Sequence, residues 1–231
     1  MGNDQLFKKR DKKENYGRKN KNLSPKSRIL IVCEGKTEVF YIDDLIKDFS
    51  IDKKVIYLIV SKDATEGNDP DKSDRSKPNG SDLQSLIKYA EDNKEKFDYI
   101  FCVCDKDAWG GQAFISVIKQ AEGSGIRMIV SEPCFEYWIL LHFEYTTEGF
   151  QRMPGEKYSD RVISSIKKHI SSYEKGNRSQ DIYKQLKGKM ENAIKNSKMS
   201  FEGAKNDSKI NTKTNFHDLI EFLRDLVSKK C

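Results

Sequence analysis

Four runs of consecutive apolar residues alternate with segments of helical periodicity, and this alternation is the strongest constraint on the fold. The runs occupy residues 28–33, 55–60, 99–104 and 127–131. Unbroken apolar runs are typical of strands that are buried on both faces of a parallel sheet. Such strands need crossover connections, which are usually helical and right-handed. The order therefore predicts an α/β fold with a parallel sheet of about four strands flanked by helices.

Apolar spacing predicts the helices and the division of the chain. Helices that belong to the sheet domain are expected over residues 37–49, 81–92, 111–121 and 134–143. Three further helical patterns follow residue 146, over residues 162–173, 181–199 and 216–227. We therefore expect a basic disordered tail over residues 1–26, a sheet domain over residues 27–145, and a helical appendage over residues 146–231 that packs on it.

Acidic residues follow two of the predicted strands directly. Glu34 and Glu38 come after the first strand, and Asp105 and Asp107 come after the third. Ligands of open α/β sheets bind beyond the carboxyl ends of the strands, so both acidic groups should share one edge. Carboxylates that converge there repel one another unless a cation compensates, and Mg²⁺ or Mn²⁺ is the natural cation for an all-oxygen site. The sequence thus predicts a metal-dependent active site.

The spacing of these acids indicates how they would be used. Glu38 lies one helical turn after Glu34, so both carboxylates can point at a common centre. Asp105 and Asp107 project to the same side of the strand end and can approach one ion. Glu136, early in an apolar helix, is a further candidate, although an acid at that position can also serve only the helix dipole.

Phosphodiester hydrolysis fits this set of acids, because divalent ions held by carboxylates neutralise phosphate charge and activate water. We expect Glu34, Asp105 and Asp107 to bind the metal, with Glu34 as an alternative general base. Glu38 and Glu136 would complete a second site or tune the first. Solvated surface acids are the alternative reading for each residue taken singly.

Basic residues point to a polyanionic partner. The net charge is +6, and lysine and arginine crowd the first segment. The residues of this tail that we expect to contact nucleic acid are Lys8, Lys9, Arg10, Lys12 and Lys13. Beside the acids, Lys36 and Lys106 are further candidate contacts. A solubilising tail, and a Lys36 that only offsets local acidity, are the alternatives.

Several segments resemble the signature segments of the RloB family, whose core is a Toprim (topoisomerase-primase) domain. They are ILIVCEGKTEVFYI, FCVCDKDAW, SEPCFEYWILLHF and NTKTNFHDLIEFL, and they span about residues 28–227. The resemblance implies that Glu34, Asp105 and Asp107 form the metal-dependent catalytic centre. It further implies a role for Glu38 and for a later acid, for which Glu132 competes with Glu136.

The same resemblance implies a Mg²⁺-dependent endonuclease in bacterial antiphage defence, with tRNA as a substrate of some members and RNA favoured over DNA. An ABC-type ATPase of the same defence system is the implied partner, since the chain has no G-x-x-x-x-G-K-[ST] loop of its own. A homo-oligomer is left open. No apolar run is long enough for a membrane span and no signal peptide is evident, so we expect a cytoplasmic protein.

Two other classes of function compete with the nuclease. A non-catalytic protein with a degenerate Toprim core would bind nucleic acid or the ATPase without cleaving anything. A haloacid-dehalogenase-type phosphatase also uses two aspartates spaced as Asp105 and Asp107 are. That class places a nucleophilic aspartate after the first strand, where this chain has Glu34.

Overall fold

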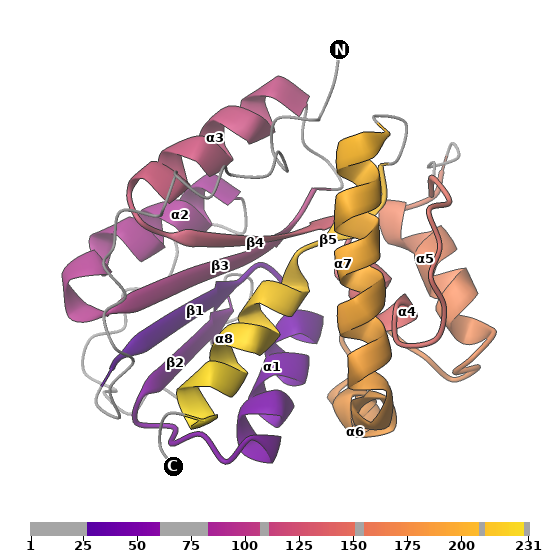
Figure 1. Ribbon diagram of the computed structural model, residues 1–231, viewed down its shortest axis with the longest axis horizontal. Coiled ribbons are helices and arrows are strands. Elements are labelled where there is room, and N and C mark those ends of the chain that lie inside the picture. The colour runs from indigo at the N-terminus through magenta and orange to yellow at the C-terminus, as the bar shows by residue number, and fades with distance from the viewer. Residues whose placement is uncertain (1–26, 61–82, 107–110, 151–154, 208–210, 229–231) are drawn as a thin grey trace.

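A computed structural model describes residues 27–60, 83–106, 111–150, 155–207 and 211–228 of the chain. Its centre is a five-stranded sheet of order β2-β1-β3-β4-β5 (Figure 1). Neighbouring strands are parallel except for β5, which pairs antiparallel with β4. The strands are β1 Ile29–Cys33, β2 Ile56–Val60, β3 Tyr99–Asp105, β4 Arg127–Glu132 and β5 Lys213–Thr214. The predicted α/β fold is confirmed, and the arrangement is consistent with a Toprim-like domain.

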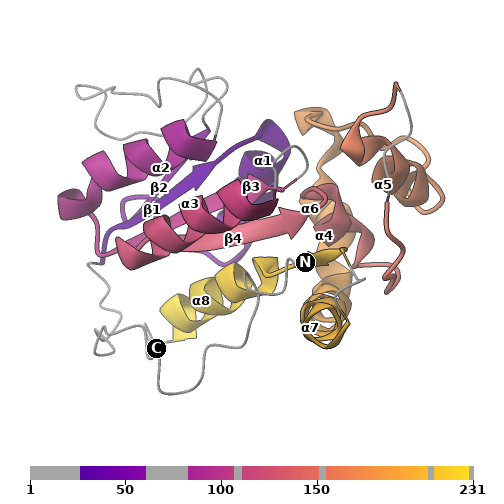
Figure 2. The same ribbon diagram turned by 90° about the horizontal axis from the view of Figure 1, so that it is seen from above.

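Helices lie on both faces of the sheet and at one end of it. Helices α2 and α3 cover one face and α1 and α8 cover the other, while α4 to α7 group at the end toward which β4 points (Figures 1 and 2). The α-helices are α1 Lys36–Asp48, α2 Leu83–Asp92, α3 Gly111–Gly123, α4 Glu136–Leu140, α5 Tyr158–Lys167, α6 Ile182–Leu186, α7 Met190–Asn206 and α8 Phe216–Ser228. Short 3₁₀ turns are η2 Lys94–Lys96, η3 Arg178–Gln180 and η4 Lys187–Lys189.

The strands alternate their side chains between two apolar clusters, as strand geometry requires. In β1, Ile29 and Ile31 pack with α1 and α8, whereas Leu30 and Val32 pack with α2 and α3. All five residues of β1 are buried. The sequence shows unbroken apolar runs because a central strand that is covered by helices on both faces has no position for a polar side chain.

An aromatic group ties α1, α4 and α8 together beneath the carboxyl end of the sheet. Tyr41 on α1 packs edge-on against Phe135, with ring centroids 5.7 Å apart. Trp138 on α4 lies 5.0 Å from the ring of Phe216 on α8. His142 is fully buried beside them and pairs through Nε2 with the Tyr41 hydroxyl at 3.1 Å. Burial lowers the pKa of His142 to about 4, so it is a neutral core residue at physiological pH.

The segment after residue 146 shares the core of the sheet domain. Helix α8 contributes Phe216, Leu219 and Leu223 to the cluster that also contains Ile31 of β1. Strand β5 joins the sheet itself through pairs of Ser131 with Thr214 and of Glu132 with Lys213. The segment after residue 146 therefore packs on the sheet and shares its apolar core.

Two features differ from expectation for local reasons. Strand β5 was not predicted, because two residues are too few to show a periodic pattern. The apolar helix expected over residues 134–143 contains only the five residues of α4 in regular form. At both of its ends the backbone bonds span three residues, as from Tyr137 N to Cys134 O and from Phe143 N to Leu140 O. These tighter turns continue the helical path outside the α-helix proper.

No helix among the described residues is both long and apolar enough to cross a membrane.

Candidate active site

Glu34 and Asp105 meet at the carboxyl edge of the two central strands. Strands β1 and β3 are parallel neighbours, with Cys33 opposite Val103. The backbone N–H of Glu34 continues this ladder by donating to the Val103 carbonyl at 3.0 Å. In return, the Asp105 N–H donates to Oε2 of Glu34 at 3.2 Å. The adjacency of the strands thus brings together two acids that are far apart in the sequence.

Asp105 also connects the sheet to the segment that precedes α4. Its side chain is only 7% exposed, and its Oδ1 accepts a hydrogen bond from the Phe135 N–H at 2.8 Å. This bond fixes the start of the α4 segment against the end of β3. Glu136, the next residue, is thereby placed on the same edge as Asp105.

Glu38 folds back over the turn between β1 and α1. A Cβ added at Gly35 would lie 2.6 Å from Oε2 of Glu38, closer than any side chain tolerates. The absence of a side chain at residue 35 therefore lets the carboxylate approach the backbone. Glu38 is 2% exposed, and its Oε2 has no hydrogen-bond partner among the described residues.

Glu136 is fully buried and faces a lysine that comes from the helical group. Lys175 Nζ lies 3.0 Å from Glu136 Oε2. The other oxygen, Oε1, has no hydrogen-bond partner in the described part of the chain. Tyr173 brings a buried hydroxyl close by that also lacks a partner there. We call Glu34, Glu38, Asp105 and Glu136 the acidic cluster.

Burial and repulsion make two members of the acidic cluster, Glu38 and Asp105, hard to ionise. Burial raises the pKa of Glu38 to about 7, and the charge of Glu136 adds to this effect. Burial likewise raises the pKa of Asp105 well above its usual range, followed by the charges of Glu38 and Glu136. Burial opposes the charge of Lys175, but Glu136, Asp105 and Glu38 raise its pKa overall, so it is a cation at neutral pH. The cluster holds more potential negative charge than this lysine neutralises.

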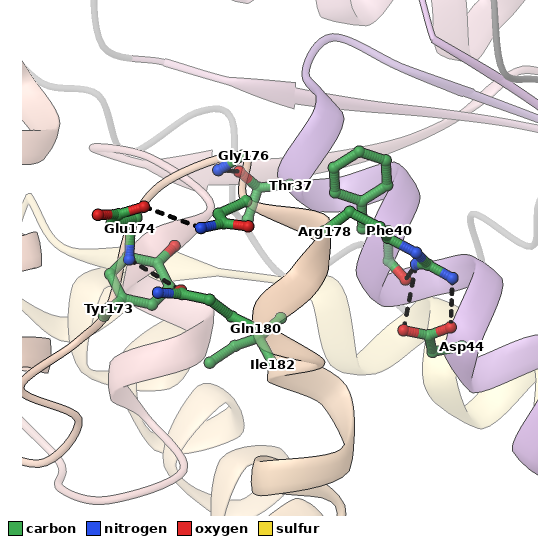
Figure 3. A pocket seen from close by; sticks show the side chains of 10 residues that line it. Thr37, Phe40, Asp44, Tyr173, Glu174, Gly176, Arg178, Gln180 and Ile182 are labelled. Atoms are coloured by element: carbon green, nitrogen blue, oxygen red, sulfur yellow. Dashed lines mark hydrogen bonds and ion pairs between the residues drawn. The ribbon is translucent and has the colours of Figure 1, made fainter.

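Lys175 is carried by a loop over residues 172–181, which we call the lysine loop, and this loop is fastened to α1. Arg178 binds Asp44 through two hydrogen bonds of 2.7 and 3.1 Å and also donates to the Phe40 carbonyl at 2.8 Å (Figure 3). Nearer the lysine, the Gly176 N–H donates to Oγ1 of Thr37 at 3.0 Å. Helix α1 therefore positions both Glu38 and the lysine loop.

Glu132 belongs to a different set of charges from Glu136. Its Oε1 lies 2.8 Å from Lys106 Nζ, and Lys213 Nζ lies 3.5 Å from its Oε2. Both lysine side chains are nearly buried, with 3% and 1% exposure. Of the two acids that competed for the last position of the site, the structure places Glu136 in the acidic cluster. It also places Lys106 away from solvent, with its ammonium group paired with Glu132.

Of the other predicted site residues, the structure describes Lys36 but not Asp107 or the residues of the tail. Lys36 is exposed at the first position of α1, next to the acidic cluster in sequence. Asp107 lies outside the described residues, and so do the tail residues Lys8, Lys9, Arg10, Lys12 and Lys13. Their predicted roles stay predictions.

One observation supports the binding of a divalent ion by the acidic cluster, and another argues against a site that is already assembled. In favour stand the buried oxygens of Glu38 and Glu136 that have no partner, because oxygen ligands of this kind are what Mg²⁺ and Mn²⁺ require. Against a preassembled cage, no three His, Cys, Asp or Glu side chains within the described ranges are arranged to hold one metal ion. An ion at this place would therefore require these side chains to move closer together.

The family model described as RloB-like protein matches residues 29–223. The chain belongs to the RloB-like family. The match covers most of the sequence, including every residue of the acidic cluster and the lysine loop, and it confirms the predicted membership. No curated protein and no solved structure matches this RloB-like chain significantly.

Sequence reasoning missed Lys175 and Tyr173. The sequence gives no reason to single out Lys175, because the lysine loop has no apolar period and contains many polar residues. Its position depends on the contact of Arg178 with Asp44, which no local pattern reveals. The one usable signal was the surplus of carboxylates at the edge of the sheet, which called for a cation.

Gly35→Ala in this RloB-like chain should push the Glu38 carboxylate out of its buried position. The backbone at residue 35 is extended, with φ −124°, so alanine itself is tolerated there. The expected results are a fall in the Glu38 pKa from about 7 toward its usual value and a stability change of only about 1 kcal/mol. Carboxyl-resolved NMR titration measures the pKa. Gly188→Ala, with open space around the added Cβ, is the matched control, and an unchanged Glu38 pKa in Gly35→Ala would contradict this account.

Proposed function

We propose that this RloB-like protein is a divalent-metal-dependent endonuclease whose active site is the acidic cluster. The observation that carries the proposal is the convergence of Glu34, Asp105 and Glu136 from the ends of three different strands. Folding gains nothing from gathering these acids, since burial and repulsion already raise the pKa of Asp105. Such an arrangement is typical of sites that are built for a cation and its ligand.

Glu34 and Asp105, with Asp107, would hold the ion. A bound Mg²⁺ or Mn²⁺ would supply Lewis-acid stabilisation of the phosphate charge and a lowered pKa for bound water. Asp105 is positioned for this by the Phe135 N–H, which leaves its other carboxylate oxygen to face the ion. Glu34 is held in the same way by the Asp105 N–H.

Glu38 is the best placed general base. A base works best when its pKa lies near the working pH, and burial brings the pKa of Glu38 to about 7. Its unpartnered Oε2 is able to accept a proton from an attacking water. The hydroxide oxygen would then form a bond to phosphorus as the bond to the leaving oxygen breaks. This assigns to Glu38 the role of general base, for which the sequence analysis had named Glu34 as an alternative to metal binding.

RNA is the proposed substrate, with tRNA as the model to test. The resemblance to the RloB family supports this choice, as does the basic character of the chain, which has a net charge of +6. Regulation by an ABC-type ATPase partner within an antiphage defence system is proposed on the resemblance alone. The choice of substrate and the ATPase partner do not alter the chemistry that we propose for the acidic cluster.

A non-catalytic binding protein is the second candidate. It is favoured by the finding that the described residues do not present a ready set of three metal ligands. Such a protein would hold RNA without metal, and its affinity would fall with salt because of counterion release.

Incubation of the purified protein with tRNA and with plasmid DNA distinguishes the two candidates. Each substrate is tested with Mg²⁺, with Mn²⁺ and with EDTA, in the presence and absence of the ATPase partner. We expect cleavage of tRNA that requires metal and stops with EDTA. Salt-sensitive binding with no cleavage under any of these conditions would establish the second candidate instead.

A further inference from the structure

Lys175 is an unusual neighbour for a metal-dependent acidic cluster, because it already supplies a positive charge there. Its ammonium group lies 3.0 Å from Oε2 of the fully buried Glu136. Among the described residues, it is the cation that lowers the pKa of both Glu38 and Asp105. The side chain is 43% exposed, so part of it is open to solvent while its ammonium group contacts the buried Glu136.

The position of Lys175 is fixed by contacts of the residues that follow it in the chain. Gly176, the next residue, binds Oγ1 of Thr37, and Arg178 forms its paired hydrogen bonds with Asp44. Both anchors belong to α1, as Figure 3 shows. Glu38 belongs to the same helix, so the lysine cannot drift relative to the acidic cluster without breaking these contacts.

An ammonium group and a divalent ion compete for the same oxygen. Mg²⁺ binds oxygen at about 2.1 Å, and the ion would repel an ammonium group held on that oxygen at close range. Lysine behaves as a compact point charge with three donors, so after pairing with Glu136 it keeps donors for another anion. The phosphate of a substrate that approaches from the solvent side is such an anion.

We propose that Lys175 is a resident cation that takes the place of a second divalent ion at Glu136, so that the site binds one divalent ion and presents Lys175 to the phosphate of the substrate. The ion is held at the strand ends by Glu34 and Asp105. Glu136 therefore does not build a second metal site, and Glu38 keeps its role as the general base. This inference rests on the proposed nuclease function and specifies how that site is charged.

Titration with Mn²⁺, followed by calorimetry and by the EPR signal of the free ion, tests the proposal without using activity. The wild-type chain should bind one Mn²⁺. Lys175→Met keeps most of the apolar stem and removes the charge, and it should bind a second Mn²⁺ at the vacated Glu136. Lys175→Arg keeps the charge and should bind one ion.

Lys187→Ala is the matched control, because Lys187 also pairs with a carboxylate, that of Asp48 at 2.8 Å, but outside the acidic cluster. It should bind one ion as the wild type does. Arg178→Ala releases the lysine loop from Asp44 while it retains Lys175. It should allow a second, weaker ion, and it keeps the proposal testable if Lys175→Met is poorly folded.

The possible stoichiometries separate the two proposals. Two ions in the wild type, or one ion in both the wild type and Lys175→Met, would overturn the role of Lys175 and leave the metal-dependent function standing. Binding of no Mn²⁺ by either protein would overturn the metal-dependent function and the inference that rests on it. One ion in the wild type and two in Lys175→Met is the result that supports both.

Discussion

Asp105→Asn should abolish metal-dependent cleavage while it stabilises the metal-free protein. Loss of groups that merely orient metal ligands costs about 10- to 100-fold in activity, so loss of a ligand itself should exceed about 100-fold. Stability should change in the opposite direction. The asparagine side chain keeps the oxygen that accepts a hydrogen bond from the Phe135 N–H. It removes a buried carboxyl group whose pKa is raised by burial and by the charge of Glu38, so the folded protein no longer has to hold that charge.

The two effects of Asp105→Asn are measured separately. Cleavage of tRNA in saturating Mg²⁺ gives the activity, and thermal unfolding in EDTA at pH 8 gives the stability. Glu221→Gln is the control, since it also neutralises a carboxylate, but one that lies on α8 and is ion-paired with Lys198. A variant that loses both activity and stability would show that Asp105 is needed for the fold, and the activity loss would then say nothing about catalysis.

The metal-free protein should lose stability as the pH rises from about 4.5 to above 7, by the amount that Glu38 contributes. The pKa of Glu38 is about 7 in the folded protein and near its usual 4.5 in the unfolded chain. The folded state therefore holds the proton more tightly, and this stabilisation is complete below pH 4.5 and is lost as the pH passes 7. Each pKa unit corresponds to about 1.4 kcal/mol, so the loss is about 3 kcal/mol.

The comparison with Glu38→Gln isolates this contribution. His142 acts in the opposite direction, because its lowered pKa of about 4 gives stability that is lost as the pH falls, so the wild-type profile alone mixes two effects. In EDTA, Glu38→Gln and the wild type should unfold at the same temperature at pH 4, and the variant should be more stable at pH 8. Mg²⁺ should reduce the difference in unfolding temperature between the variant and the wild type at pH 8. A difference in unfolding temperature that stays the same from pH 4 to pH 8 would contradict the raised pKa of Glu38.

The apolar runs of the strands, and the acids that follow them, made much of the site predictable. Apolar runs that end in Glu34 and Asp105 were enough to place both residues at one edge, since parallel neighbours end together. Glu136 was a candidate because it comes early in the apolar helix that was predicted after the fourth strand. The pairing of Lys106 with Glu132 was not predictable, although alternation along β3 did place Lys106 opposite Asp105.

Contacts between distant segments decided the parts that the sequence did not show. The position of Lys175 depends on the contact of Arg178 with Asp44, and that of β5 depends on its contacts with β4, α7 and α4. Asn215 adds to this by bonding the backbone of β4, with its Oδ1 2.7 Å from the Val130 N and its Nδ2 3.0 Å from the Met128 O. A side chain that completes a sheet edge in this way leaves no periodic trace in the sequence.

Phe216 comes late in the chain, yet its ring packs on Tyr41, Phe135 and Trp138 beneath the acids. A ribosome that has synthesised only the strands has thus not yet made the residue that closes this core. Domains fold as units, and contacts between distant segments form late. A nascent chain would accordingly reach the end of α8 before its carboxylates were held in place, so the acidic cluster is complete only once that helix has been made.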